Sequence, residues 1–370
     1  MRILFVNDLP LGAGWGAEIY AARLLDGLQK AGDETAVFAG EVRHRGLGRL
    51  LDAWDPLARR ALARVGARFR PDVVHHHNIL RELSASVLGV PRDTATVLTV
   101  HDVRLFGVPD DQVHGLRAAA ARLKGAVDTR IASRRIHVAV AVSEQIARRL
   151  HAAGFRDVEH VPVFAPAPEK EPAPIRTSTD VVVVGRLTPH KGAHVAVEAF
   201  GRIAARHPAA RLLIAGDGSE AGKLSRLAAP FGDRVQMLGR LAEDEVRRLM
   251  GSARLLVAPT IPRLVPEGAG ITLIEAALLG RPVVVSDDPA LREFVDKSGG
   301  GLIVPPESAE ALAAAMDLLL SDDETAGRLG ETGRRYALAH HTTEAVVPRI
   351  RAIYARAMQR AGSPALGPSR

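Results

Sequence analysis

Short apolar runs and longer stretches with helical periodicity alternate along the whole chain. Most of these runs are continuously apolar, which is typical of strands covered on both faces of a sheet. They predict strands at Ile3–Val6, Thr35–Ala39, Asp72–His75, Thr96–Val100, Val138–Val142, Asp180–Val184, Arg211–Ala215, Arg234–Leu238, Leu255–Ala258, Pro282–Ser286 and Gly301–Val304. Because these strands alternate with helices, the pattern indicates an α/β protein with parallel sheets.

One proline-rich segment interrupts the alternation. It contains Pro162, Pro166, Pro168, Pro172 and Pro174, and proline cannot donate to a sheet and restricts the residue before it. We therefore predict two Rossmann-like domains: residues 1–165, a linker at 166–176, residues 177–345, and a C-terminal helix and tail at 346–370. Ligands of open parallel sheets bind at the carboxyl ends of the strands. We expect the two domains to face each other across a cleft, with the last helix packing back toward the N-terminal domain.

Composition is that of a soluble globular protein. The chain has 370 residues, of which 47% are hydrophobic and 25% charged, and it has no cysteine, which excludes disulfides and thiolate chemistry. The apolar run at the N-terminus is too short for a signal peptide, and no uncharged run approaches the roughly 18 residues that span a bilayer. We therefore expect a cytoplasmic protein.

Positive charge dominates the chain, with a net charge of +7 and a pI of about 10.2. It fits either a plain preference for arginine or attraction to an anionic membrane, a phosphorylated substrate or nucleic acid. An aromatic content of 4% argues against nucleic acid. Residues 43–70 hold eight arginines and two aspartates among apolar residues at near-helical spacing. This segment is either a domain helix with a solvated basic face or a peripheral contact with the inner face of a membrane.

Two carboxylates separated by seven residues form the first chemical motif, Glu267-Gly268-Ala269-Gly270-Ile271-Thr272-Leu273-Ile274-Glu275. The glycines precede a helical run, so they lie at a strand-to-helix turn where free backbone N–H groups and the helix dipole favour phosphate. Glu267 and Glu275 can both face a ligand bound there. The alternative is an ordinary capped helix with a surface glutamate at each end.

Two cations follow a predicted strand in the second motif, Val184-Gly185-Arg186-Leu187-Thr188-Pro189-His190-Lys191-Gly192. A nucleoside diphosphate gains negative charge as it leaves a sugar, and Arg186 and Lys191 at a dry strand end would stabilise that charge. The alternative is a pair of exposed loop cations.

In this order, the two motifs resemble the retaining glycosyltransferases of family 4, which have the GT-B fold. Trp15-Gly16-Ala17-Glu18, Gly216-Asp217-Gly218 and Gly280-Arg281-Pro282-Val283-Val284 extend the resemblance over most of the chain. It implies a hexosyltransferase with a nucleotide-sugar donor bound in the C-terminal domain and the acceptor in the N-terminal domain. UDP-sugar is favoured, with GDP-, ADP- and TDP-sugars open. No cofactor or metal is implied, and the acceptor is sugar-containing, a lipid or a small molecule.

The resemblance also implies a role for each matching residue. Arg186 and Lys191 hold the diphosphate, Glu267 meets the sugar hydroxyls, Glu275 binds the ribose, and His101 lies near the reacting centre. It assigns catalysis to His101, Arg186, Lys191 and Glu267, and donor binding to Gly14, Gly16, Gly185, Arg240, Leu241, Gly268, Ala269, Gly270, Ile271, Thr272 and Glu275. The backbone near Arg240 and Leu241 reads the base, and the loop at Gly14–Gly16 closes onto the diphosphate. The implied mechanism is same-face displacement without an enzymic nucleophile, and His101 is either a polar contact or a structural histidine.

Three positions depart from the family pattern. Ala269 replaces an aromatic residue, so we expect a wider or differently shaped sugar pocket, and Trp15 replaces the first glycine of a Gly-Gly pair. Val161-Pro162-Val163-Phe164 lacks the usual Asn-Gly, which puts acceptor-side or hinge contacts in doubt.

Other functions explain fewer of the residues. His75-His76-His77 suggests a metal, but strand geometry splits the side chains between two faces, and we expect polar residues lining the acceptor cleft instead. Residues 12–17 match a dinucleotide fingerprint, which favours an NAD-dependent oxidoreductase but leaves both motifs unexplained. A sugar-nucleotide epimerase or a phosphorylase of the same fold needs groups that the sequence does not place. A catalytically silent partner would not need the two motifs.

Overall fold

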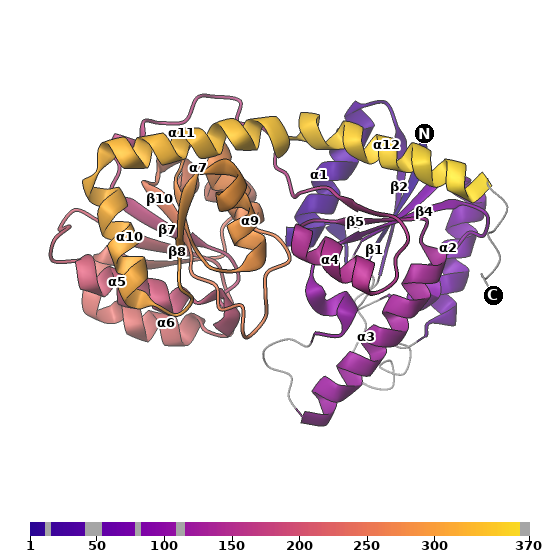
Figure 1. Ribbon diagram of the computed structural model, residues 1–370, viewed down its shortest axis with the longest axis horizontal. Coiled ribbons are helices and arrows are strands. Elements are labelled where there is room, and N and C mark those ends of the chain that lie inside the picture. Colours follow the sequence, from indigo (N-terminus) through magenta and orange to yellow (C-terminus); the bar gives the residue numbers. More distant parts are fainter. Residues whose placement is uncertain (12–15, 41–53, 78–82, 109–114, 363–370) are drawn as a thin grey trace. The chain divides into compact units, whose positions relative to one another are not determined.

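The computed structural model describes residues 1–11, 16–40, 54–77, 83–108 and 115–362, which divide into two compact units (Figure 1). Unit 1 comprises Met1–Val163 and Thr343–Arg370, and unit 2 comprises Phe164–Thr342. Among the described residues, each unit has one six-stranded sheet in which every pair of neighbouring strands is parallel. The predicted α/β class with two Rossmann-like domains is therefore confirmed.

The sheet of unit 1 has the strand order β2-β1-β3-β4-β5-β6. Its strands are β1 (Arg2–Asn7), β2 (Glu34–Ala39), β3 (Val73–His77), β4 (Ala95–Val100), β5 (Val138–Ala141) and β6 (Val158–His160). Its helices are α1 (Gly16–Lys30), α2 (Pro56–Phe69), η3 (Ala85–Val87), η4 (Val103–Phe106), α3 (Gly115–Arg135), α4 (Glu144–Ala152) and α12 (Thr343–Gly362). The strand order reverses between β1 and β3, and the carboxyl ends of strands at such a reversal are the usual place for a ligand.

The sheet of unit 2 has the strand order β12-β11-β10-β7-β8-β9. Its strands are β7 (Asp180–Val184), β8 (Arg211–Ala215), β9 (Val235–Gly239), β10 (Leu255–Ala258), β11 (Val283–Ser286) and β12 (Gly301–Val304). Its helices are η5 (Ile175–Thr177), η6 (Pro189–Lys191), α5 (Ala193–Ile203), α6 (Ala221–Ala228), η7 (Ala229–Arg234), α7 (Glu243–Ser252), α8 (Ile271–Leu278), α9 (Pro289–Ser298), α10 (Ala309–Ser321) and α11 (Asp323–His340). Here the order reverses between β7 and β10.

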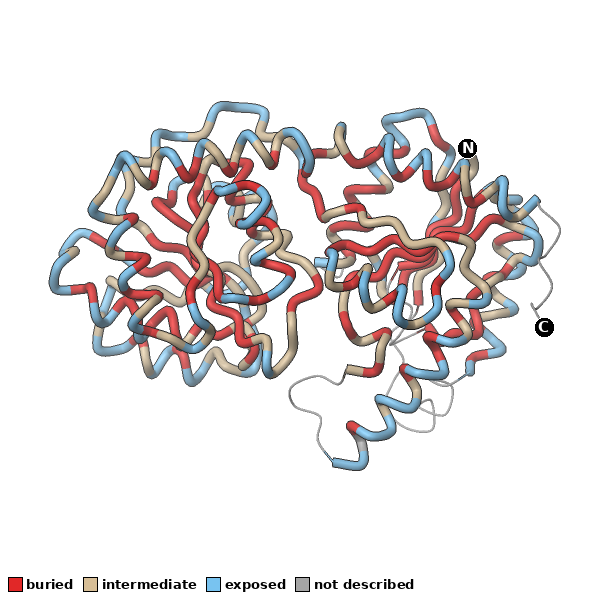
Figure 2. The backbone as a smooth tube through the Cα atoms, in the orientation of Figure 1, coloured by how far each residue is buried: buried red, intermediate tan, exposed pale blue. Residues whose placement is uncertain are grey.

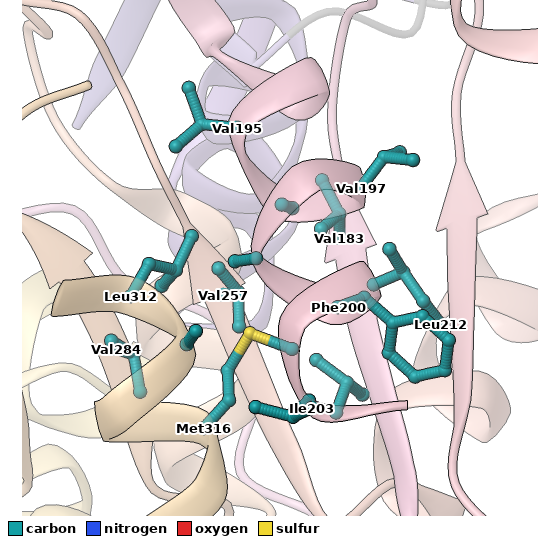
Figure 3. Close-up of a cluster of buried hydrophobic side chains, with 14 of the residues drawn as sticks. Val183, Val195, Val197, Phe200, Ile203, Leu212, Val257, Val284, Leu312 and Met316 are labelled. Carbon is teal, nitrogen blue, oxygen red and sulfur yellow. The ribbon is translucent and has the colours of Figure 1, made fainter. Parts of the chain in front are cut away.

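Burial on both faces explains why these strands are visible in the sequence. The β4 segment is buried at every residue, as are β3, β5 and β11. In unit 2, Figure 3 shows Phe200 and Ile203 of α5 packed with Leu212 of β8 and Met316 of α10. A side chain of this size contributes about 1.5–3 kcal/mol when it is fully buried. All the predicted strands are present, to within two residues at each end.

The C-terminal helix α12 belongs to unit 1, although it is the last helix in the sequence. It packs against α1, β3, β4 and β5. The hydroxyl of Tyr354 bonds to Nδ1 of His75 at 2.7 Å, and Arg351 pairs with the buried carboxylate of Asp33 at 3.1 Å. The expectation that this helix packs on the N-terminal domain is therefore confirmed.

The described part of segment 43–70 is largely an ordinary domain helix. Asp55 caps α2 by accepting from Leu57 N and Ala58 N, and Leu62 is fully buried. Leu62 therefore belongs to the core, whereas Leu57 is exposed. Residues 41–53 lie outside the described part of the chain. No helix in the described residues is long and apolar enough to cross a membrane.

Candidate active site

The loops that follow β7, β8 and β9 are bonded into one surface at the carboxyl edge of the unit 2 sheet. Gly185 N donates to Ala215 O at 3.0 Å, Leu187 N to Asp217 O at 2.9 Å, and Gly216 N to Gly239 O at 2.7 Å. A Cβ on Gly216 would lie 1.8 Å from Gly185 O, so no larger residue fits there. These contacts fix the backbone from which Arg186 extends.

The turn that carries Lys191 is fastened to the loop after β10. Gly192 ends η6 in a left-handed conformation with φ 65°, and a Cβ there would lie 1.9 Å from Pro259 O. Next to it, Ile261 N donates to His190 O at 2.7 Å. The loops after β7 and β10 are therefore held together where the strand order reverses.

Lys191 and Glu267 form an ion pair at this reversal, with Nζ 2.6 Å from Oε1. Their side chains are 28% and 10% exposed, so the cation has access to solvent while the carboxylate is nearly buried. The structure thus joins one residue from each of the two sequence motifs. A cation beside a carboxylate at a strand end can bind an anionic leaving group and the hydroxyls of a neighbouring sugar.

Asp288, which was not among the residues predicted from the sequence, fixes the backbone of Glu267. Its carboxylate is fully buried; Oδ2 accepts from Glu267 N and Oδ1 from Ala290 N, both at 3.0 Å. Burial, and then the nearby charge of Glu267, raise the pKa of Asp288 to about 6. An aspartate directly before Pro289 is a signal for a helix N-cap, which Asp288 is for α9. That signal does not reveal the contact with Glu267.

The glycine motif lies at the N-terminus of α8, as the spacing predicts. Gly270 is the N-cap and offers no side-chain bond, and Gly270 Cα is so close to α9 that a Cβ would lie 2.7 Å from Leu291 Cδ2. The first N–H groups of a helix have no partner within the helix, so the amides near Ile271 and Thr272 suit an anion. Glu275 lies on α8 and is half-buried.

The remaining predicted residues of unit 2 lie at the same edge. Arg240 and Leu241 follow β9, and Gly268 and Ala269 stand between Glu267 and the start of α8. Arg240 is exposed, whereas Gly268 is buried. All the predicted donor-binding residues of unit 2 therefore follow the carboxyl ends of its strands.

Unit 1 contains Gly16, the first residue of α1, and His101, which follows β4. Gly14 lies outside the described residues. His101 is 8% exposed, its Nε2 lies 3.1 Å from Nδ1 of His77, and its ring meets the ring of Tyr20 edge-on at 4.8 Å. Burial lowers the pKa of His101 to about 3. His101 is therefore neutral at pH 7, which suits a hydrogen-bonding contact better than a charged one.

The three consecutive histidines of β3 are fully buried, so the expectation that they line a cleft is wrong. Nε2 of His75 lies 2.7 Å from Oγ1 of Thr99, and its Nδ1 lies 2.7 Å from the hydroxyl of Tyr354. Both ring nitrogens of His76 lack a hydrogen-bond partner among the described residues. Burial lowers the pKa of all three, for His76 to about 3.

Comparison with known proteins supports one identification for both units. A family model described as Glycosyltransferase Family 4 matches residues 15–165, and one described as Glycosyl transferases group 1 matches residues 168–336. A glycogen synthase of Mycobacterium tuberculosis is 27% identical over 320 residues, which cover 82% of this chain and 75% of that protein. A phosphatidyl-myo-inositol mannosyltransferase of Mycolicibacterium smegmatis is 33% identical over 216 residues, covering 56% and 54%. The structure of Anabaena Alr3699/HepE with UDP and glucose superposes with a TM-score of 0.72 at 18% identity, covering 96% and 99%.

Proposed function

Because this chain belongs to glycosyltransferase family 4 and has the GT-B fold, we propose that it is a retaining enzyme that uses a UDP-sugar. The enzyme is a hexosyltransferase with a nucleotide-sugar donor. The UDP complex of the Anabaena protein supports UDP as the nucleotide. In the proposed reaction the bond from the sugar C1 to the diphosphate breaks, and a bond from C1 to the acceptor oxygen forms on the same face. The acceptor proton passes to the leaving phosphate.

The ion pair of Lys191 with Glu267 is the observation that carries this proposal. It lies at the reversal of strand order in unit 2, where an open parallel sheet binds its ligand. Lys191 and Arg186 would neutralise the diphosphate as it leaves, and Glu267 would accept hydrogen bonds from the sugar hydroxyls. Glu275 would bind the ribose, and the amides near Gly270 and Ile271 would add contacts to the donor.

The remaining residues have narrower proposed roles. His101, neutral through burial, would contact the sugar without acting as a base, and Gly14 and Gly16 would approach the diphosphate. Gly185, Gly268, Ala269 and Thr272 would shape the donor site, while Arg240 and Leu241 would face the base. No metal ion or cofactor enters this scheme, since fixed cations balance the leaving charge.

The acceptor is proposed to be sugar-containing, a lipid or a small molecule. A lipid is supported by the name of one relative, a phosphatidyl-myo-inositol mannosyltransferase. We place the protein in the cytoplasm with peripheral contact to the inner membrane face, and the basic segment 43–70 is the part of the sequence that suggested this contact. The domain boundaries 1–165, 166–176, 177–345 and 346–370 form part of the same proposal.

Thermal unfolding in the presence of UDP, GDP, ADP, TDP or NAD tests the proposed donor class. A nucleotide present at about 100 times its Kd should stabilise the protein by roughly 2.7 kcal/mol. We expect UDP to give this shift, Lys191→Ala to abolish it, and Lys223→Ala to keep it, because Lys223 pairs with Glu220 on the surface of the same unit. Stabilisation by NAD alone would contradict the proposed transferase. Stabilisation by another nucleoside diphosphate would identify that nucleotide, in place of UDP, as part of the donor.

A further inference from the structure

Helix α3 is held against unit 1 by one narrow face. Gly125 approaches Gly107 so closely that a Cβ on Gly125 would lie 2.2 Å from Gly107 N. One turn later, Oγ1 of Thr129 donates to Leu105 O at 2.8 Å, and Ala132 is fully buried. These contacts fix the rotation of the helix about its axis, so the opposite face must point away from the unit.

That outward face is apolar. Leu116 is 90% exposed, Leu123 70% and Val127 50%, and Ala120 is exposed as well. Positions spaced by three, four and seven residues share one side of an α-helix, so these four side chains form a continuous stripe. Figure 2 shows exposed residues recurring along α3, and Figure 1 shows the N-terminal end of this helix extending from the rest of unit 1. Single exposed leucines are common, but an aligned stripe on a helix normally marks a contact surface.

Cations follow the stripe on the same side of the helix. Arg130 and Arg134, three and seven residues after Val127, are exposed, whereas the helix's one acidic residue, Asp128, is buried and paired with Lys124 at 2.5 Å. A second copy of this helix would bring like charges together, which is unfavourable. Nucleic acid would leave the leucines in water, and α3 has no aromatic side chain on which bases could stack. An anionic lipid surface offers an apolar region that can bury the stripe and phosphates that can pair with the cations.

We propose that α3 is the surface by which this protein docks on anionic membranes, with Leu116, Ala120, Leu123 and Val127 entering the interface and the arginines facing lipid phosphates. The inference rests on the proposed membrane contact and moves it from the basic segment 43–70 to α3. It does not depend on the donor or on the transfer reaction.

Flotation with vesicles of phosphatidylcholine alone, or with phosphatidylglycerol added, tests the proposal on the full chain. We expect binding only to the anionic vesicles, and weaker binding as salt rises. The double variant Leu116→Gln/Leu123→Gln should lose at least tenfold in binding, because it removes two leucines that membrane binding would bury. The matched control Ala119→Gln/Ala126→Gln has the same seven-residue spacing at exposed positions beside the stripe and should bind like the wild type.

Charge is tested separately by Arg130→Gln/Arg134→Gln, which should weaken binding and reduce its salt dependence. All substituted residues are exposed, so the melting temperature and the UDP shift should stay unchanged and report on folding and donor binding independently. If the wild-type protein does not bind anionic vesicles, every proposed membrane contact is wrong. Undiminished binding by the leucine variant overturns the assignment to α3, leaving residues 43–70 as the contact. A wild-type dimer that the leucine variant dissociates would identify a second copy as the occupant and also overturn the proposal.

Discussion

At the scale of single residues, the ion pair of the solvent-accessible Lys191 with the nearly buried Glu267 is the centre of the proposed chemistry. Its charge is already balanced without a donor, so in the proposed reaction an incoming diphosphate would compete with Glu267 for the lysine. The lysine would then bind the leaving group, and the carboxylate would accept hydrogen bonds from sugar hydroxyls. Loss of Lys191 should therefore affect turnover more strongly than loss of a residue that contacts only the bound nucleotide.

Replacing Lys191 by alanine should lower kcat by about 10²–10³, because charge that develops in the transition state loses a fixed cation. Glu275→Ala should instead raise the donor KM more than it lowers kcat, since the proposed ribose contact would be made both before and during the reaction. Steady-state kinetics with the donor identified by thermal shift measure both. Turnover of Lys191→Ala within a few fold of the wild type would remove the lysine from the mechanism.

Asp288 should act through Glu267 rather than by touching the donor. Asp288→Ser keeps a residue able to cap α9 but is too short to hold Glu267 N as well, whereas Asp288→Ala loses both functions. We expect both variants to weaken UDP binding similarly, and only the alanine to lose about a further 1 kcal/mol of stability.

Asp322 provides the matched control for this pair, because it caps α11 by accepting from Thr325 N at 2.9 Å. Asp322→Ala should lower the melting temperature and leave UDP affinity intact. Titration calorimetry and thermal unfolding separate the two effects. An Asp288→Ser protein that binds UDP like the wild type would show that Asp288 is only a cap.

At the scale of elements, the sequence was most informative where a strand is buried on both faces. Val181 to Val183 and Val138 to Ala141 are buried and read as continuous apolar runs. The short β6 strand was missed because Val158, Glu159 and His160 form a half-buried edge without an apolar run. Edge strands are recognised by their neighbour in the sheet, which single-sequence patterns do not contain.

The candidate site was also predictable only in part, because a single sequence does not show which strands are neighbours in the sheet. Spacing placed Lys191 and Glu267 at strand ends, but only the strand order brings β7 and β10 together. Asp288 belongs to a later loop, 21 residues beyond Glu267. The sequence signal for a helix N-cap at Asp288 gives no indication that its carboxylate also bonds to the backbone of Glu267. The histidines of β3 were misread because their polarity suggested exposure, whereas Thr99 and Tyr354 supply buried partners for His75.

The buried histidines of β3 and the buried His101 after β4 should make the stability of unit 1 sensitive to acid. The pKa values of His76 and His101 fall to about 3 in the folded protein, against about 6.5 when unfolded. Below pH 6.5 the unfolded chain therefore takes up protons that the folded one does not, and the free energy of unfolding falls as pH falls. Each histidine contributes about 1.4 kcal/mol per pH unit between pH 6.5 and about 3, and His75 and His77 add slopes of the same sign.

The variant His76→Leu should reduce this slope by one histidine's share. It should also raise stability at pH 7.5 by about 1–3 kcal/mol, since two buried nitrogens without described partners are removed. Urea unfolding at pH 7.5, 6.5 and 5.5 measures both effects, with the exposed His151 replaced by leucine as the control. Equal slopes in His76→Leu and the wild type would contradict a neutral buried His76.

At the scale of the whole molecule, unit 1 is assembled from both ends of the chain while unit 2 is continuous. The buried side chains Ile350, Ile353 and Tyr354 of α12 complete the unit 1 core. The proline-rich segment, in contrast, is held by unit 2, where Arg281 donates to Ala173 O and to Gly251 O. The two units therefore depend on different parts of the chain for their stability.

Ending the chain after Thr342 removes α12 and should unfold unit 1 while unit 2 stays folded. Limited proteolysis and hydrogen exchange should find protection lost in β3 and β4 and retained in β7 and β8. A chain that ends after Gly362 keeps all of α12 and is the matched control. Protection of β3 and β4 in the shorter chain would show that α12 is dispensable for the core of unit 1.

The membership of α12 in unit 1 also sets an order of events on the ribosome. The segment Met1–Val163 emerges before unit 2, but the helix that completes unit 1 begins at Thr343, after the whole of unit 2 has been made. At roughly 5–20 residues per second, the interval lasts about 10–40 s. Until α12 is made, the side chains around His75 lack the contact that Tyr354 supplies in the folded protein, and this is the interval in which chaperones should bind the chain. Unit 1 therefore begins before unit 2 in the chain and completes its fold after it.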